Sequence, residues 1–428
     1  MGSLGRSRAL RPAALTISAN DATAGLGRGF WTLAGSSGLS NLADGVFKVA
    51  LPLVAVSYTR SPGLIAGLEL VRTLPWLVLS LQVGALVDRI DRRRAMVVAN
   101  SVRAACVAGP AIIIAADAGA LWILYLAALG TGVAEVFYDT SSQSILPTVV
   151  DRTRLDAANG RLYAVETGTQ QFAGPPVAGL LVALGLAVSF AVPAVLWILA
   201  VALLYLLRGS FRPERLGPRT TIRHDIREGL TFLRRRPVLR TMAVMVGVGN
   251  LAASATGAVL VLYAVGDDSI LGLSEPAFGF LFATTAMGAL IGGLAAERIQ
   301  TGLGRGRTLT VTTAAMALWV ATPALTTNIA LIAGGLFVGG VAIMVWNVTT
   351  VSFRQRVTPD HLLGRVNSTY RLLAWGTMPL GAALGGLLGE WLGVRAVFAV
   401  MGVVSATIIV PALRLTDEAL DAAEAHPG

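Results

Sequence analysis

Apolar residues occur along this chain in long blocks, and short polar segments rich in arginine separate them. The blocks are about 20 residues long, which is the length a helix needs to cross a bilayer. A backbone in lipid must satisfy its own hydrogen bonds, so the blocks predict helices, and the short alternating segments of a membrane β-barrel are not seen. Twelve spans are predicted: Trp31–Tyr58, Leu64–Val87, Ala95–Ala115, Leu121–Ser142, Leu162–Leu186, Ser189–Leu207, Met242–Val265, Ala277–Ala296, Thr308–Thr326, Ile329–Ser352, Val366–Leu388 and Ala396–Leu413.

Composition and charge support a membrane protein. Hydrophobic residues make up 54% and charged residues 14% of the chain, against about a quarter charged in ordinary soluble domains. If both termini are cytoplasmic, the outer loops hold only Arg60 and Arg395 of the 34 basic residues, as the positive-inside rule requires. This predicts a multi-pass protein of the cell (inner) membrane, whose net charge of +10 reflects topology and implies no nucleic-acid partner. Four bases are embedded: Lys48, Arg72, Arg103 and Arg371.

A motif occurs twice, each time between two apolar spans. Its first copy is Gly84-Ala-Leu-Val-Asp88-Arg89-Ile-Asp-Arg92-Arg93, and a weaker copy, Gly293-Leu-Ala-Ala-Glu297-Arg298, follows 209 residues later. Tyr138–Ser142 also matches Trp346–Thr350 at an offset of 208. Such a repeat predicts two homologous helix bundles, the architecture of a transporter. The expected units are a disordered segment 1–29, a six-helix bundle 30–207, a cytoplasmic linker 208–241, a second six-helix bundle 242–414 and a cytoplasmic tail 415–428.

The linker contains a helical pattern of apolar residues accompanied by arginines. Ile222, Ile226, Leu230 and Leu233 recur at helical spacing. The pattern fits a helix lying on the inner membrane surface, and it fits equally a linker helix packed on the bundles.

These features together resemble the major facilitator superfamily, whose cytoplasmic signature is similar to Gly84–Arg93. Closer likeness to the bacterial branch of macrolide-type drug exporters and siderophore exporters is carried by Asn41–Gly45, Arg72–Trp76 and Thr358–Val366. The resemblance implies an all-α integral membrane protein with twelve transmembrane helices in two pseudo-symmetric six-helix bundles. Leu126 stands where antiporters of the family carry an arginine on span four, so the resemblance alone does not imply family-type proton coupling.

Embedded charged residues are the first candidates for function, because charges in a bilayer are costly and usually face a cavity. Asp44 and Lys48 lie one helical turn apart on span one, which predicts either a static ion pair or a coupling element. Buried carboxyl groups can exchange protons near neutral pH. The candidates for proton coupling are Asp44, Lys48, Glu135 and Glu166.

The repeated motif is expected to act as a latch on the cytoplasmic side. Gly84 lets two helices approach closely, and the arginines can bridge to acids or helix C-terminal carbonyls of the neighbouring bundle. Plain topogenic charge is the alternative reading. Asp139 is expected to pair with the arginines at 89–94. The latch comprises Gly84, Asp88, Arg89, Arg92, Arg93, Asp139, Glu297 and Arg298.

Prolines and glycines inside spans five and eleven predict bends, since proline removes a backbone donor. They provide either hinges for rocking or simple small-residue packing. The hinge candidates are Gly174, Pro175, Pro176, Gly179 and Pro379. The residues expected to line a substrate cavity are Asn41, Glu69, Arg72, Asn250, Trp346, Asn347 and Trp375.

The sequence therefore predicts a secondary active exporter of small apolar or amphiphilic molecules that works by alternating access coupled to proton influx. A uniporter or proton symporter for a small nutrient is the alternative, and a membrane sensor without transport is a third reading. No phosphate-binding loop, catalytic motif or buried histidine cluster is seen, so no enzymatic activity, cofactor or metal is expected. The expected partners are a small-molecule substrate, protons and the lipid bilayer, with a monomeric protein.

Overall fold

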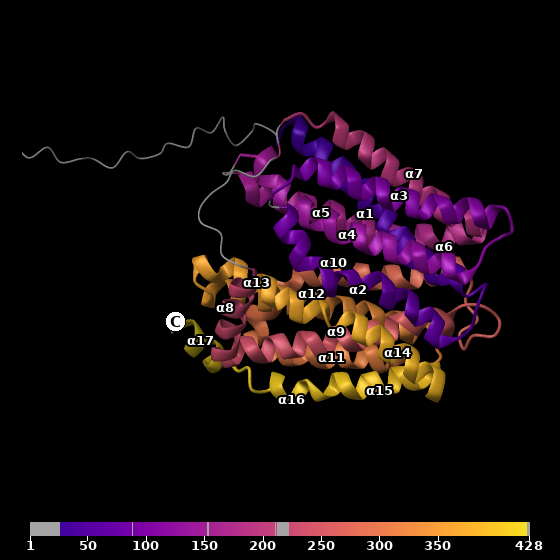
Figure 1. Ribbon diagram of the computed structural model, residues 1–428. Helices are drawn as coiled ribbons and strands as arrows, with labels where there is room; N and C mark the ends of the chain where they lie inside the picture. Colours follow the sequence, from indigo (N-terminus) through magenta and orange to yellow (C-terminus); the bar gives the residue numbers. More distant parts are fainter. Residues whose placement is uncertain (1–25, 88, 152–153, 210, 212–221, 426–428) are drawn as a thin grey trace, which may run out of the picture.

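The computed structural model describes residues 26–87, 89–151, 154–209, 211 and 222–425. Within them the chain is helical, apart from turns, loops and one isolated bridge between Val265 and Leu273. Two bundles of helices lie side by side (Figure 1). The first contains α1 (Gly27–Ala55), α2 (Pro62–Val87), α3 (Arg92–Ala115), α4 (Leu121–Val149), α5 (Leu155–Thr167), the π-helix η2 (Gly168–Ala173), α6 (Gly174–Leu184) and α7 (Leu186–Leu206).

The second bundle repeats this arrangement. Helices α4 and α12 have 29 residues each, and their bounds are related by the offset of 208 seen in the sequence. The second bundle contains α9 (Pro237–Ala264), α10 (Glu275–Leu303), α11 (Arg305–Leu325), α12 (Ile329–Val357), α13 (Asp360–Trp375), α14 (Met378–Leu392), α15 (Val394–Thr407) and α16 (Ile409–Ala412).

Membrane-crossing helices account for most of the described chain. Eleven helices among these residues are long and apolar enough to cross a bilayer. The fifth predicted span is the continuous run α5–η2–α6, which begins at Leu155 and so extends beyond the predicted start at Leu162. The protein is therefore a multi-pass membrane protein with the predicted all-helical fold.

The predicted bends lie at equivalent places in the two bundles. In the fifth span, η2 begins at Gly168 and ends just before Gly174, where Pro175 and Pro176 cannot donate to the preceding turn. The eleventh span breaks between Trp375 and Met378, just before Pro379. Gly168 and Gly376 are related by the same offset of 208, so the repeat preserves the position of the break.

Side chains of α9 donate hydrogen bonds to backbone carbonyls on either side of the break in the eleventh span. Asn250 Nδ2 donates to the carbonyl of Ala374 at 2.8 Å, and Ser254 Oγ donates to the carbonyl of Met378 at 2.7 Å. A buried carbonyl without a donor costs about 1–3 kcal/mol. Asn250 and Ser254 therefore hold the broken helix in place.

Helices α2 and α6 of the first bundle pack against α14 and α10 of the second. Glycines allow the close approach: a Cβ on Gly179 would lie 2.3 Å from the carbonyl oxygen of Glu275, and one on Gly279 would lie 2.4 Å from that of Pro175. Glu390 Oε2 accepts from Ser61 Oγ at 2.9 Å and from Gly63 N at 3.1 Å, across the two bundles. We call this region the far end.

At the opposite end, which we call the linker end, lie α8 (Ile222–Arg235), α17 (Asp417–Ala425) and the start of α1 (Figure 1). Residues 1–25 of the expected disordered segment lie outside the described residues, whereas residues 27–29 are helical. Helix α8 packs against α13, with Leu233 buried among Leu239 and Met242. Of the two readings of the linker pattern, packing on a bundle is the one observed for this part of the helix.

The tail forms a helix whose acidic residues contact the linker end of the second bundle. Arg305 pairs with Asp421 and lies 2.6 Å from Glu424, and Arg356 lies 2.9 Å from Glu424. Burial opposes ionisation of Glu424, but hydrogen bonds from Arg356 and Arg305 outweigh it and lower the pKa of this carboxyl below 4.5. The group contributes to docking in its charged form.

Docking of α17 is therefore expected to weaken in acid. A carboxyl whose pKa is lowered by folding stabilises the docked state above its undocked pKa, and that contribution is lost as the pH falls through the docked value. A fluorophore at Ala425→Cys in a Cys106→Ala background should show constant anisotropy above about pH 4.5, the usual value, and lower anisotropy below it. Glu424→Gln should give the lower anisotropy throughout, and Glu418→Gln, at an exposed acid of the same helix, should follow the parent. A parent signal that does not change with pH would contradict the prediction.

Candidate functional site

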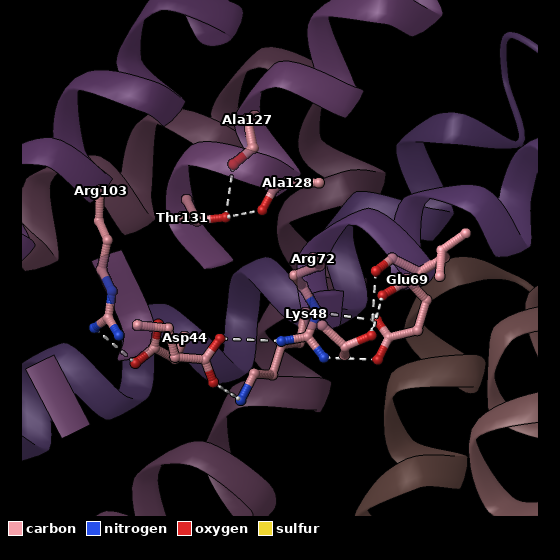
Figure 2. A network of polar contacts seen from close by, with 11 residues as sticks. Asp44, Lys48, Glu69, Arg72, Arg103, Ala127, Ala128 and Thr131 are labelled. Atoms are coloured by element: carbon pink, nitrogen blue, oxygen red, sulfur yellow. Dashed lines mark hydrogen bonds and ion pairs between the residues drawn. The ribbon is translucent and has the colours of Figure 1, made fainter. Parts of the chain in front are cut away.

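A network of charged side chains lies inside the first bundle, where α1, α2, α3 and α4 meet (Figure 2). Glu135 of α4 binds two bases: Oε1 lies 3.1 Å from Lys48 Nζ of α1, and Oε2 lies 3.1 Å from Arg72 Nη1 of α2. Arg72 also holds Glu69, with Nε 2.9 Å from Oε2 and Nη2 2.7 Å from Oε1. This group of four residues is called the Glu135 cluster.

A second pair lies beside it and is more deeply buried. Arg103 of α3 contacts Asp44 of α1, with 3.1 Å between Nη1 and Oδ2. Arg103 is fully buried, and Asp44 is 6% exposed. The Arg103 guanidinium also lies over the ring of Tyr138, 4.8 Å from its centroid, and 5.9 Å from the centroid of the Trp197 ring. Cation–π contacts of this kind offset part of the cost of burying the charge.

The network is electrically balanced. Asp44, Glu69 and Glu135 provide three negative charges, and Lys48, Arg72 and Arg103 provide three positive ones. Breaking a buried pair leaves an uncompensated charge that costs several kcal/mol, so partners for every member make the arrangement tolerable in a membrane interior.

The predicted ion pair between Asp44 and Lys48 is wrong. The two residues are one turn apart on α1, but Asp44 pairs with Arg103 and Lys48 pairs with Glu135. Spacing within one helix is favourable for a surface pair worth a few tenths of a kcal/mol. Asp44 and Lys48 pair instead with a base on α3 and an acid on α4. Those residues are buried, and an unpaired charge there is far more costly than at a surface.

Two predicted acids have no basic partner at ion-pair distance among the described residues. Glu166 of α5 accepts a hydrogen bond from Ser37 Oγ at 2.7 Å. Asn41, predicted to line the cavity, donates to the carbonyl of Ser37 at 2.9 Å. Asp139 of α4 is half-buried, and no ion pair joins it to Arg89, Arg92, Arg93 or Arg94. The expected contact between Asp139 and those arginines is therefore wrong for this state of the protein.

The first copy of the repeated motif makes its contacts within its own bundle. Arg93 Nη1 donates to the carbonyl of Leu207 at the end of α7, and Arg92 N donates to the carbonyl of Phe211 at 3.2 Å. Asp91 caps α3 by accepting from Arg94 N at 3.0 Å. The predicted type of acceptor, a helix C-terminal carbonyl, is observed, but in the first bundle and not in its neighbour.

For the other latch residues that the structure describes, no ion pair to the neighbouring bundle is seen. Asp88 lies outside the described residues, and a Cβ on Gly84 would meet open space. Glu297 and Arg298 are exposed. Among the residues described, no ion pair joins the two bundles at the linker end. The latch stays a prediction about another state of the protein.

A cavity of about 280 Å³ lies between the two bundles, next to the Glu135 cluster. Lys48, Glu69 and Arg72 line it from the first bundle. The second bundle contributes uncharged residues: Asn250, Ala253, Ser254, Gly257, Ala258, Val261, Phe278, Phe282 and Met378. Apolar residues of the first bundle also line the cavity: Val49, Leu51, Pro52, Ile65 and Leu68. The lining is thus largely apolar, with charged groups on the first-bundle side alone, an arrangement that suits amphiphilic molecules.

A second cavity of about 110 Å³ lies inside the second bundle and shares Asn250 and Ala253 with the central cavity. The predicted cavity residues Trp346 and Asn347 line this one. Trp375 lies elsewhere: its ring packs edge to face on Trp76 of α2, with centroids 4.7 Å apart. That contact joins α13 to the first bundle.

The predicted hinge residues occupy tight helix crossings. A Cβ on Gly174 would lie 2.6 Å from the Cα of Gly45 on α1, and Gly179 faces α10. Pro379 is buried at the start of α14. These contacts establish close packing, and the hinge role stays a prediction.

From the sequence, Arg103 was recognised only as one of four embedded bases, and its pairing with Asp44 was not predicted. Its signal was present: a base in the middle of an apolar span is costly unless it faces partners. With Leu126 replacing the arginine of span four, and 59% exposed, the buried bases of this bundle come from α1, α2 and α3.

The relatives and solved structures reported below, to which this chain is similar, are named as pumps and transporters or as a homologue of one. Residues 26–427 match the family model described as transmembrane secretion effector. The chain is 30% identical to the multidrug efflux pump Tap of Mycolicibacterium fortuitum, covering 87% of this chain and 93% of that protein. It is 29% identical to Tap of Mycobacterium tuberculosis (strain ATCC 25618 / H37Rv), covering 83% and 85%.

Solved structures show the same fold at low sequence identity. The nucleoside transporter NupG is similar with a TM-score of 0.74 and 12% identity, covering 91% of this chain and 99% of that one. A bacterial homologue of the iron transporter ferroportin in its inward-facing state is similar with a TM-score of 0.72 and 16% identity, covering 92% and 99%.

Proposed function

This chain belongs to the transmembrane secretion effector family of the major facilitator superfamily, and we propose that it exports small apolar or amphiphilic molecules from the cell. The observation that carries the proposal is the central cavity, whose lining is mostly apolar in both bundles and carries charge only at Lys48, Glu69 and Arg72 of the first. The similarity to two proteins named multidrug efflux pumps supports the same substrate class.

Transport proceeds by alternating access in this proposal. The bundles rock about the central cavity, so that it opens first to the linker end and then to the far end. The hydrogen bonds of Glu390 with Ser61 and Gly63, and that of Arg60 with the carbonyl of Val265 at 2.9 Å, join the bundles at the far end. Positive-inside topology puts the linker end in the cytoplasm, so this state would receive substrate from inside the cell.

Proton influx drives export in this proposal, and Glu166 is the acid we favour. Asp44, Glu69 and Glu135 are each bound to a base, so protonating any of them would remove the counter-charge of an embedded cation. Glu166 has a hydroxyl donor in Ser37 and no such base, so it can gain and lose a proton without leaving a buried cation unpaired.

Replacing Glu166 with glutamine is expected to abolish export driven by a proton gradient. Glutamine keeps an oxygen that can accept from Ser37 and loses the ability to exchange a proton. Inside-out vesicles would be energised with an imposed proton gradient and tested with macrolides, siderophores and lipophilic cations. Glu418→Gln, at an exposed acid of α17, is the matched control and should transport like wild type. Wild-type transport that ignores the gradient would overturn proton coupling, and Glu166→Gln transport at the wild-type rate would overturn the role of Glu166.

A further inference from the structure

The cavity inside the second bundle is chemically unlike the central one. Adaptable thioether side chains of Met245 and Met316 line it, together with the rings of Trp319 and Trp346. None of its lining residues is charged. A wall of this kind favours an apolar or aromatic group over an ionised one.

Two residues that line this cavity each carry a buried polar atom without a hydrogen-bond partner among the described residues. Trp346 is 5% exposed and Ser405 is 3% exposed. Trp346 Nε1 and Ser405 Oγ are both buried without a partner among the described residues. The indole nitrogen can only donate, so an acceptor is the chemistry that would satisfy it. Buried polar groups are normally paired, and an exception points to water or a ligand.

The size and position of the cavity restrict what it can take. Its volume of about 110 Å³ is of the order of the roughly 150 Å³ cavity known to hold a benzene ring. Asn250 and Ala253 line both this cavity and the central one, so the two cavities are neighbours on either side of these residues. Asn250 Nδ2 already donates to the carbonyl of Ala374, which fixes this side chain between the two cavities.

We propose that this cavity is a subsite that binds one ring or a branched alkyl group carrying a hydrogen-bond acceptor, while the polar part of the same molecule lies in the central cavity. Trp346 and Ser405 donate to the acceptor, and Met245 and Met316 pack on the ring. The proposal deepens the export function and rests on it for the identity of the molecule as substrate. It narrows the substrate class to amphiphiles with a ketone, ether or ester close to an apolar end.

Three glycines allow the subsite to be tested with one type of substitution. A Cβ at Gly249, Gly257 or Gly334 would meet nothing within 4 Å. Gly249 lines the proposed subsite, Gly257 lines the central cavity, and Gly334 lies on the exposed face of α12. Leucine at each position adds the same side chain to the same bundle, so differences between the variants report which space was filled.

The probe is an amphiphile that joins a trimethylammonium head to a benzophenone, which forms a carbon–carbon bond to nearby side chains under ultraviolet light. Labelling uses the full-length protein in lipid nanodiscs, and mass spectrometry locates the labelled residue. We expect labelling at Met245 or Met316 in wild type and in Gly334→Leu. Gly249→Leu should reduce this labelling roughly tenfold, because the leucine side chain occupies space that the ring needs and overpacking of this kind weakens binding by about that factor. Trp346→Phe, which keeps a ring and removes the donor, should reduce it roughly threefold.

The outcomes separate the subsite from the export function. Labelling confined to the central cavity, or unchanged at Met245 and Met316 in Gly249→Leu, would overturn the subsite. Reduced labelling there in Gly257→Leu alone would also overturn it, since the ring would then occupy the central cavity. Labelling at the expected residues supports the subsite even if vesicles show no export, and that second result would count against the proposed function alone.

Discussion

Replacing Asp44 with leucine is expected to lower the free energy of unfolding by about 3–5 kcal/mol, the cost of leaving a buried charge without its partner. Arg103 is fully buried, and its Nη1 lies 3.1 Å from Asp44 Oδ2. Its other hydrogen bonds, to Ser40 Oγ at 3.2 Å and to Asn100 Oδ1 at 3.4 Å, and its contacts with the rings of Tyr138 and Trp197 involve no negatively charged group. The substitution would therefore leave a positive charge in the interior of the first bundle.

Thermal unfolding of the purified protein in detergent would measure the effect. The double variant Asp44→Leu with Arg103→Met removes both charges and keeps similar volumes, so it should recover most of the lost stability. Glu69→Gln is the comparison for a more exposed acid, because its side chain is 27% exposed, and the expected loss is about 1 kcal/mol or less. An Asp44→Leu variant that unfolds at the wild-type temperature would show that the buried pair does not stabilise the bundle.

The helices and the two-bundle fold could be predicted from the sequence because each membrane-crossing helix is recognised by its own apolar length. The repeat added the pairing of the bundles, and α4 and α12 reproduce its offset of 208. The breaks at η2 and before Met378 follow from Pro175, Pro176 and Pro379, which are local signals too.

The pairing of charges could not be predicted in the same way. Asp44 and Lys48 satisfy the spacing rule for a helical ion pair, yet each binds a residue of another helix. Which helices face each other is decided by packing over the whole bundle, and no local pattern records it. The sequence identified the charged residues, and the structure was needed to connect them.

The residues that line the two cavities were also predicted only in part. Glu69, Arg72 and Asn250 were predicted to line a substrate site, and all three line the central cavity. The separation of Trp346 and Asn347 into a second cavity depends on the packing of α9, α11 and α12 and was not anticipated. Trp375 could not be assigned from sequence either, because its neighbour, Trp76, belongs to the other bundle.

Replacing Gly279 with leucine is expected to hold the two bundles apart at the far end. A Cβ at this position would lie 2.4 Å from the carbonyl oxygen of Pro175, and 3.1 Å from the Cα of Pro176. Both are backbone atoms of α6, so they cannot move aside as the end of a flexible side chain could. Overpacking costs about 1–3 kcal/mol, which would lower the ratio of closed to open far ends roughly 5- to 150-fold.

A cysteine pair at Ser61 and Glu390 provides the measurement, because the two side chains are in contact in this structure and would separate if the far end opens as proposed. In a Cys106→Ala background, Gly279→Leu should slow oxidative cross-linking of this pair and the rate of export by similar factors. Gly302→Leu is the control on α10, since Gly302 is exposed and an added Cβ there would meet nothing within 4 Å. It should cross-link and transport like the parent. If Gly279→Leu cross-links at the parent rate while export is lost, closure at this crossing is not what limits transport, and the rocking model must place its far-end contact elsewhere.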